Sequence, residues 1–176
     1  MRVVAGDLRG RRLTAPPGRA VRPTSDRVRE ALFSIVGDVA DLRVLDLFAG
    51  SGALGIEALS RGASEAVFVD TSRRAVAAVR ANLDALALEA PVYRRDALAF
   101  LAGADHAGAF DVAFIDPPYD LASRLAAPLA ERLPARLTDE ARIVTESDKR
   151  HPLLMPFPLV RERFYGDTRI AVYRGG

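Results

Sequence analysis

The sequence predicts one α/β domain, with a mostly parallel sheet, helices on both of its faces and an antiparallel hairpin at its carboxyl end. Short apolar runs alternate with segments of helical periodicity, and this alternation implies right-handed crossovers between parallel strands. The chain has 176 residues, of which 49% are hydrophobic and 27% are charged. That composition is typical of a compact globular protein and excludes disordered and fibrous chains.

The individual elements follow from periodicity and turn signals. A first helix is expected to begin at a cap formed by Thr24, Ser25 or Asp26 and to end near Gly37, because its apolar residues recur at i, i+3, i+4 and i+7. Strands are predicted at residues 43–48, 65–70, 91–95, 110–115 and 141–146, and a closing hairpin at 159–165 and 168–174. Further helices are predicted at residues 53–61, 72–86 and 96–101 and along a leucine stripe at 121–133.

A small extra hairpin is predicted at the start of the chain. Residues 2–6 and 11–15 flank a polar turn, and Pro16-Pro17-Gly18 then breaks the chain. We therefore divide the chain into a basic N-terminal arm, residues 1–20, and a main domain, residues 21–176.

The residue inventory excludes several kinds of chemistry. There is no cysteine, so disulfides, thiolate metal sites and cysteine nucleophiles are excluded. The two histidines, His106 and His151, lie far apart without ligand-spaced partners, so we expect no metal site. No run reaches the roughly 18 apolar residues of a membrane span, and the chain starts without a signal-peptide core. We expect a cytoplasmic protein that works away from membranes.

Positive charge is concentrated at the start of the chain. Residues 1–30 contain eight arginines and three acidic residues, a net charge of +5, whereas the whole chain carries only +2. Because arginine and lysine make phosphate contacts, a basic arm on a near-neutral body suggests a nucleic acid as partner. The alternative is a merely solvated surface in an arginine-rich protein with a single lysine, Lys149.

A glycine-rich loop suggests a nucleotide-like cofactor. Gly50-x-Gly52-x-x-Gly55 lies between a predicted strand and a predicted helix, and Asp70 follows about 20 residues later. Asp70 could accept both hydroxyls of an adenosine ribose. This pattern fits NAD and S-adenosylmethionine equally well. Asp46 favours the latter, because a carboxylate there can meet the ammonium of a methionine moiety and would repel a pyrophosphate.

A second motif, Asp116-Pro117-Pro118-Tyr119, closes the strand predicted at residues 110–115. The exocyclic amine of a nucleobase is a poor nucleophile, because its lone pair is delocalised into the ring. If Asp116 and the carbonyl of Pro117 both accept hydrogen bonds from that amine, its lone pair turns toward the methyl donor and developing positive charge is stabilised. Proline has no N–H, so the carbonyl stays free, and Tyr119 would stack on the base. Paired prolines also occur in ordinary loops that have no catalytic role.

Together these motifs resemble the class I S-adenosylmethionine-dependent methyltransferases of the amino-methylating branch. The matching positions are residues 44–55, Asp70, Asp96 and residues 116–119. A Rossmann-like, seven-stranded sheet is implied, and the antiparallel closing hairpin distinguishes this fold from the ordinary dinucleotide-binding one. Asp96 could reach an adenine amino group or cap the following helix, and both can hold.

The resemblance narrows to the bacterial RsmD family, which methylates guanine N2 in small-subunit (16S) ribosomal RNA. The segments that carry it are residues 2–6, 10–13, 22–33 and 144–147. It implies a target guanine turned out of its stack, in an assembled or partly assembled small ribosomal subunit. The arm would grip the rRNA, while Arg22, Thr24 and Arg27 would border the pocket, although Arg27 could instead pair with Glu30 along the helix.

The site implied by the resemblance has two parts. The cofactor, S-adenosyl-L-methionine, would be bound by Asp46, Phe48, Gly50, Ser51, Gly52, Asp70, Thr71, Asp96 and Ala97. The catalytic residues would be Asp116, Pro117 and Tyr119. Three alternatives remain open: an amino-methyltransferase of DNA, one of protein glutamine, which usually has asparagine in place of Asp116, and a catalytically silent ribosome-assembly factor.

Overall fold

The computed structural model describes residues 1–16, 25–103, 108–118 and 120–175. The strands are β1 (Arg43–Leu47), β2 (Glu65–Asp70), β3 (Val92–Arg94), β4 (Phe110–Ile115), β5 (Leu137–Asp148), β6 (Leu159–Tyr165) and β7 (Thr168–Arg174). The helices are α1 (Asp26–Val36), α2 (Ala53–Ser60), α3 (Arg73–Leu86), α4 (Ala97–Ala102) and α5 (Ala122–Arg132), followed by a 3-10 turn, Pro134–Arg136. In the described part of the chain, each helix is too short or too polar to span a bilayer.

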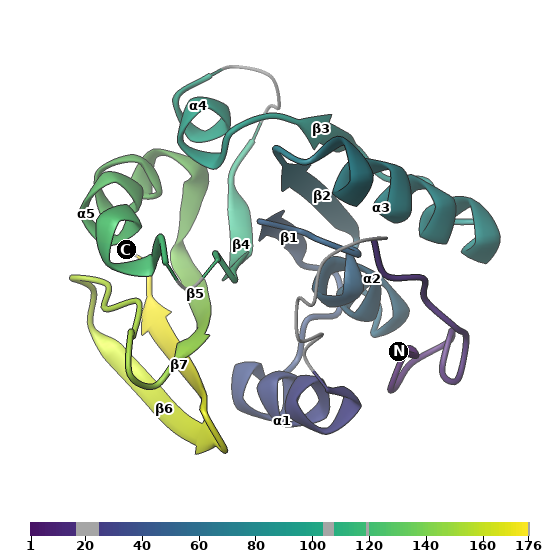
Figure 1. Cartoon of the computed structure of the whole chain (residues 1–176), viewed down its shortest axis with the longest axis horizontal. Coiled ribbons are helices and arrows are strands. Elements are labelled where there is room, and N and C mark those ends of the chain that lie inside the picture. Colours follow the sequence, from purple (N-terminus) through teal and green to yellow (C-terminus); the bar gives the residue numbers. More distant parts are fainter. Residues whose placement is uncertain (17–24, 104–107, 119, 176) are drawn as a thin grey trace.

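The strands form one sheet in the order β3-β2-β1-β4-β5-β7-β6 (Figure 1). Strands β1 to β5 run parallel, and β7 is antiparallel to both of its neighbours. The predicted mostly parallel sheet with an antiparallel closing hairpin is therefore confirmed. Strands β1 and β4 lie side by side at the centre, where the chain's direction of travel across the sheet reverses.

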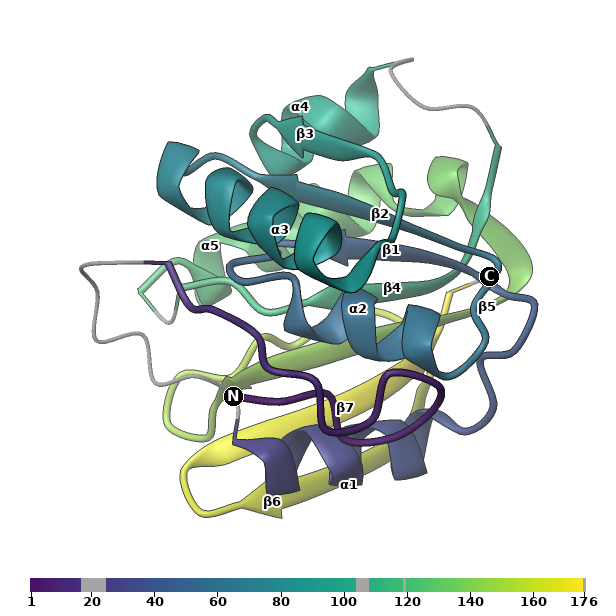
Figure 2. The ribbon, with the colours of Figure 1, turned by 90° about the vertical axis from the view of Figure 1, so that its right-hand side faces the viewer.

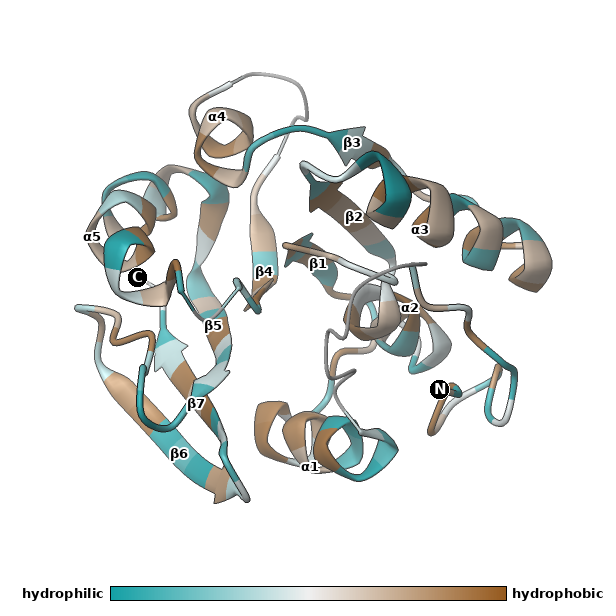
Figure 3. Cartoon of the chain, viewed as in Figure 1, coloured by the Kyte–Doolittle hydropathy of each residue, from teal (hydrophilic) through white to brown (hydrophobic). Residues whose placement is uncertain are grey.

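Alternate side chains of the central strands face two separate apolar layers. Val44, Phe68 and Phe114 pack in the layer under α1, α2 and α3, whereas Leu45 and Ile115 pack under α4 and α5. Figure 2 shows helices on the two faces of the sheet, and Figure 3 shows brown, hydrophobic stretches along the central strands. Burial on both faces explains why these strands read as nearly continuous apolar runs.

The first helix begins where the sequence allowed it to begin. The Ser25 side chain accepts a hydrogen bond from the Val28 backbone N–H at 3.2 Å, so Ser25 is the N-cap, and Gly37, at φ +86°, ends the helix. Thr24, the other candidate cap before it, lies outside the described residues.

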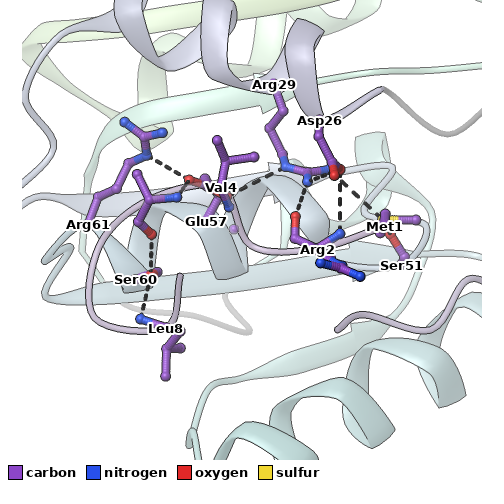
Figure 4. Close-up of polar contacts among 12 residues, drawn as sticks. Met1, Arg2, Val4, Leu8, Asp26, Arg29, Ser51, Glu57, Ser60 and Arg61 are labelled. Atoms are coloured by element: carbon purple, nitrogen blue, oxygen red, sulfur yellow. Dashed lines mark hydrogen bonds and ion pairs between the residues drawn. The ribbon is translucent and has the colours of Figure 1, made fainter. Parts of the chain in front are cut away.

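The N-terminal arm turns back on itself as the predicted hairpin, although its two sides are too short to form regular strands. Backbone hydrogen bonds join the two sides, from Val3 N–H to Arg11, from Gly10 N–H to Val3 and from Leu13 N–H to Met1, next to an antiparallel bridge between Arg2 and Arg12. The Glu57 carboxylate of α2 also accepts backbone hydrogen bonds from Val4 and Ala5, at 2.7 and 2.9 Å (Figure 4). The arm is thus paired with itself and held on α2 at the same time.

Candidate active site

The central reversal of the sheet places the ends of β1 and β4 next to each other. Leu47 pairs with Ile115 in register, so the glycine loop that follows β1 and the Asp116 loop that follows β4 leave the same edge. In open α/β sheets this position, outside the carboxyl ends of the strands, is where ligands bind. The two motifs found in the sequence therefore meet at one site.

The glycine loop has left-handed backbone at three positions. Phe48, Gly50 and Gly52 have φ of +64°, +58° and +78°. The Gly50 N–H donates to Asp70 at 2.9 Å, and the other oxygen of Asp70 accepts from the Ser72 N–H at 2.8 Å. Asp70 thus joins the loop after β1 to the loop after β2. Among the residues that the structure describes, a methyl group on Gly50 would meet only the Phe48 carbonyl oxygen, at 3.9 Å, so these residues leave room next to this glycine.

Asp46 lies beneath the glycine loop and is only 3% exposed. Its Oδ2 accepts a hydrogen bond from the Gly55 N–H at 2.9 Å. The pKa of Asp46 is raised to about 8, chiefly by burial and to a smaller extent by the Asp70 carboxylate, while the Gly55 hydrogen bond acts in the opposite direction. Gly55 is required here because a Cβ would stand 2.3 Å from the buried Phe68 ring. Asp46 therefore holds the first turn of α2 against the sheet.

Asp116 follows the last residue of β4 and is half-buried. Desolvation by burial raises its pKa well above the ordinary value, and the carboxylates of Glu146 and Asp46 raise it further. Pro117 is buried and Pro118 is exposed, and the Pro118 carbonyl accepts from the Leu121 N–H at 2.9 Å. Tyr119 lies outside the described residues, so its stacking role stays a prediction.

The other expected cofactor residues lie along the same edge of the sheet. Asp96 caps α4, accepting from the Ala99 N–H at 3.0 Å, so its capping role is observed and its adenine contact stays a prediction. Ala97 is buried behind it, and Thr71 is exposed. The carbonyl of Ser51 accepts a hydrogen bond from Asn82, at 2.9 Å, and the Ser51 hydroxyl lies 3.4 Å from the Met1 sulfur.

Sequence reasoning missed Glu146 as a candidate site residue. It lies on β5, next to β4, and is 5% exposed. Its charge acts on Asp116, as the pKa of Asp116 indicates. The available signal was its place near the end of a predicted strand within residues 144–147, which were used only for the family resemblance. In the ranges that the structure describes, no cluster of three or more histidine and acidic side chains is placed to hold a metal.

The site suits a cationic adenosyl cofactor better than a dinucleotide. Asp46, Asp70 and Asp116 place three carboxyl groups at this edge, and a sulfonium or an ammonium nearby would favour their charged forms, whereas a pyrophosphate would be repelled by them. The room that the described residues leave next to Gly50 lets a ligand approach the backbone closely. The residues present therefore fit S-adenosylmethionine.

The parallel sheet with an antiparallel β7, the glycine loop after β1 and the acidic end of β2 define the class I methyltransferase fold. A family model described as Conserved hypothetical protein 95 matches residues 1–174. The ribosomal RNA small subunit methyltransferase D of Escherichia coli (strain K12) is 38% identical over 183 residues, which cover 99% of this chain and 89% of that protein.

Two further comparisons agree with this match. The protein of the same name from Haemophilus influenzae is 35% identical over 182 residues, covering 99% of this chain and 93% of that one. The solved structure of a hypothetical protein from Thermus thermophilus superposes with a TM-score of 0.84 at 31% identity and covers 99% of both chains. The chain belongs to the RsmD family, and the resemblance seen in the sequence is confirmed.

Proposed function

We propose that this protein transfers a methyl group from S-adenosylmethionine to the exocyclic N2 of a guanine in small-subunit (16S) rRNA. The observation that carries the proposal is the β1–β4 register, which brings Asp116 beside the glycine loop and Asp46. An amine held by Asp116 would then face the methyl donor. Membership of the RsmD family, whose named relatives are methyltransferases of small-subunit rRNA, supports the choice of substrate.

The cofactor, when bound, supplies an electrophilic methyl group on a sulfonium. Gly50 and Gly52 would allow its close approach to the backbone, and Asp46 would complement its ammonium. Asp70 would accept hydrogen bonds from the ribose, because a carboxylate with two backbone donors retains lone pairs for further bonds. Asp96 would accept from the adenine amino group. Phe48, Ser51, Thr71 and Ala97 would line the same pocket.

The chain's own catalytic groups act on the amine. Asp116 and the Pro117 carbonyl would each accept one N2–H, which fixes the amine and turns its lone pair toward the methyl group. Asp116 stabilises the positive charge that develops on N2 and then accepts the proton that N2 loses. Tyr119 would stack on the guanine. The reaction is a direct displacement, so no covalent enzyme intermediate is formed.

The substrate would be presented in an assembled or partly assembled small subunit, and the protein would work in the cytoplasm. Labelled S-adenosylmethionine should be offered separately with unmodified small subunits, free rRNA and DNA, and the modified nucleoside identified after digestion. N2-methylguanosine from subunits or rRNA is the expected product. Label in DNA or in protein glutamine would overturn the substrate, and failure to bind S-adenosylmethionine would point to an assembly factor.

The role of Asp116 can be tested separately. Asp116→Ala should lower the rate of methyl transfer by at least about 100-fold, because a preorganised charge-stabilising group is lost. It should leave cofactor affinity unchanged, as measured by calorimetry. Asp120→Ala is the matched control, since Asp120 is an exposed carboxylate of the same loop, and this variant should stay active. An active Asp116→Ala enzyme would rule out the proposed role.

A further inference from the structure

A basic groove lies between α1 and β6, away from the residues assigned so far to cofactor and catalysis. Its cavity has a volume of about 460 Å³. The residues that matter here are Arg27, Glu30 and Ser34 from α1 and Arg161, Arg163 and Tyr165 from β6. Figure 2 shows α1 lying along the β6–β7 hairpin. Three guanidinium groups face one carboxylate, so the groove carries a net positive charge.

The register of the closing hairpin explains why the arginines of β6 gather on one side. Arg161 pairs with Val172 and Arg163 with Ile170, and both apolar partners belong to the layer under α1. Because side chains alternate across a strand, the two arginines point to the α1 side. Glu162, between them, points to the opposite side, where it pairs with Arg169 at 2.5 Å.

The arginines of the groove are available to a ligand. Arg27, Arg161 and Arg163 are all exposed. Among the described residues, none of the three forms an ion pair, and the one hydrogen bond from their side chains runs from Arg163 to the backbone carbonyl of Glu162, at 2.8 Å. An exposed guanidinium without an acidic partner is suited to bind a phosphate, which it can contact through two N–H groups.

The groove leads to the edge of the sheet that carries Asp116. Strand β6 is antiparallel to β7, which is antiparallel to β5, so Tyr165 ends β6 at the same edge at which β4 ends. Arg142 of β5 pairs with Val112, near the start of β4, and donates to the Val36 carbonyl at the end of α1, so α1 runs the opposite way. Arg27, in the first turn of α1, therefore lies at the active edge as well.

We propose that this groove binds the phosphate backbone of the rRNA strand that carries the target nucleotide. The proposal rests on the proposed function and identifies the part of the surface that holds the substrate. Arg161 and Arg163 lie about 7 Å apart along one face of the strand, so they can contact different phosphates. Tyr165, which also lines the groove and ends β6, offers a ring on which a flanking base can stack.

The experiment compares two double variants that each remove two exposed positive charges. Arg161→Gln/Arg163→Gln changes the groove, and Arg124→Gln/Arg174→Gln changes exposed arginines on α5 and at the end of β7. Affinities for unmodified small-subunit rRNA and, separately, for unmodified small subunits are measured by filter binding over a range of salt concentrations. Affinity for S-adenosylhomocysteine is measured in parallel, and it should be the same in all three proteins.

The groove variant should bind rRNA at least about 10-fold more weakly at low salt, and the slope of log affinity against log salt should fall by about 1.4, because two phosphate contacts are lost. The control variant should stay within about 2-fold of the wild type.

Equal losses in both variants would indicate only general electrostatic attraction and would overturn the proposal. An unchanged rRNA affinity combined with weaker subunit binding would assign the groove to a ribosomal protein and would also overturn it. These measurements record binding and not methyl transfer. They therefore test the groove even if the proposed reaction is wrong.

Discussion

Asp46 has an ionisable side chain in a position that disfavours its charged form. It is almost fully buried, and the charged form of a buried carboxyl is penalised, so its pKa rises to about 8. A single backbone donor, the Gly55 N–H, compensates only part of that penalty. This buried carboxyl group is suited to a cationic ligand, because an ammonium bound beside it would favour its charged form.

The burial of Asp46 predicts a pH dependence of stability. An unfolded aspartate titrates near pH 3.9, so between about pH 4 and pH 8 the folded protein holds a proton that the unfolded chain lacks. Raising the pH through this window therefore lowers the free energy of unfolding, by up to about 1.4 kcal/mol per pH unit for one group. Asp46→Asn keeps an acceptor for Gly55 and removes the titration, so its stability should fall less steeply between pH 5 and pH 8 in urea unfolding.

Asp116 should contribute a similar slope, because its pKa is also raised, and Asp116→Asn makes a second informative variant. Asp84→Asn serves as control, since Asp84 is exposed on α3, and its curve should run parallel to the wild type. Parallel curves for the wild type and Asp46→Asn would contradict the assignment.

The conformations and contacts of the residues around the glycine loop could be predicted from the sequence only in part. Left-handed backbone at Gly50 and Gly52 follows from their spacing and from glycine's freedom at positive φ. Phe48 also has positive φ, and nothing in its side chain favours that conformation. The bond from Gly55 to Asp46 depends on how α2 lies over β1, and Glu146 comes near Asp116 only through the pairing of β4 with β5. Such contacts arise from tertiary packing and have no local signal.

At the scale of elements, Glu57 ties the N-terminal arm and α1 to α2 (Figure 4). Its side chain and that of Arg29 are fully buried, and the two lie 3.6 Å apart. Arg61 adds a second ion pair at 2.9 Å, and the amides of Val4 and Ala5 complete the partners of the carboxylate. Three segments distant in sequence thus share one buried charge.

Replacing Glu57 should therefore loosen the arm. Glu57→Gln should lower the free energy of unfolding by about 3 kcal/mol, because the fully buried Arg29 loses the charge of its ionic partner on α2. Hydrogen exchange at the amides of residues 4 and 5 should accelerate. Glu65→Gln is the matched control: its ion pair with Arg43 is partly exposed and should be worth about 1 kcal/mol or less. Equal losses in the two variants, or amides that stay protected in Glu57→Gln, would refute the proposed link.

The bounds of most elements could be predicted, because periodicity and caps are local. Strands β2 and β4 and both strands of the closing hairpin begin and end at the expected residues. Strand β5 is longer than residues 141–146, since its pairing with β7 continues to Asp148. The two sides of the arm pair with each other as expected, but the arm also contacts Glu57 and Ser60, which lie more than 50 residues away. Long-range contacts of this kind cannot be predicted from the periodicity of the sequence, which is a local signal.

At the scale of the whole molecule, the order of the strands explains why one edge carries the candidate site. Alternating strands and helices imply a parallel sheet, but they do not specify that β1 and β4 are central neighbours or that α1 lies beside β6. The first arrangement brings the glycine loop to Asp116. The second places the basic groove so that it opens toward the same edge.

Because the proposed cofactor site joins the loops after β1 and β2, ligand binding there should stabilise the entire fold. A ligand present at 100 times its dissociation constant adds about 2.7 kcal/mol to the free energy of unfolding, which for a domain of this size corresponds to a rise in Tm of about 5 to 10 °C. S-adenosylhomocysteine should produce this rise in the wild type and in Asp116→Ala. Asp70→Ala should lose most of it, because the carboxylate that orders Gly50 and Ser72 and would bind the ribose is gone. Each variant is compared with its own ligand-free Tm, so loss of the loop contacts alone cannot imitate the result. A full shift in Asp70→Ala would place the cofactor elsewhere in the molecule.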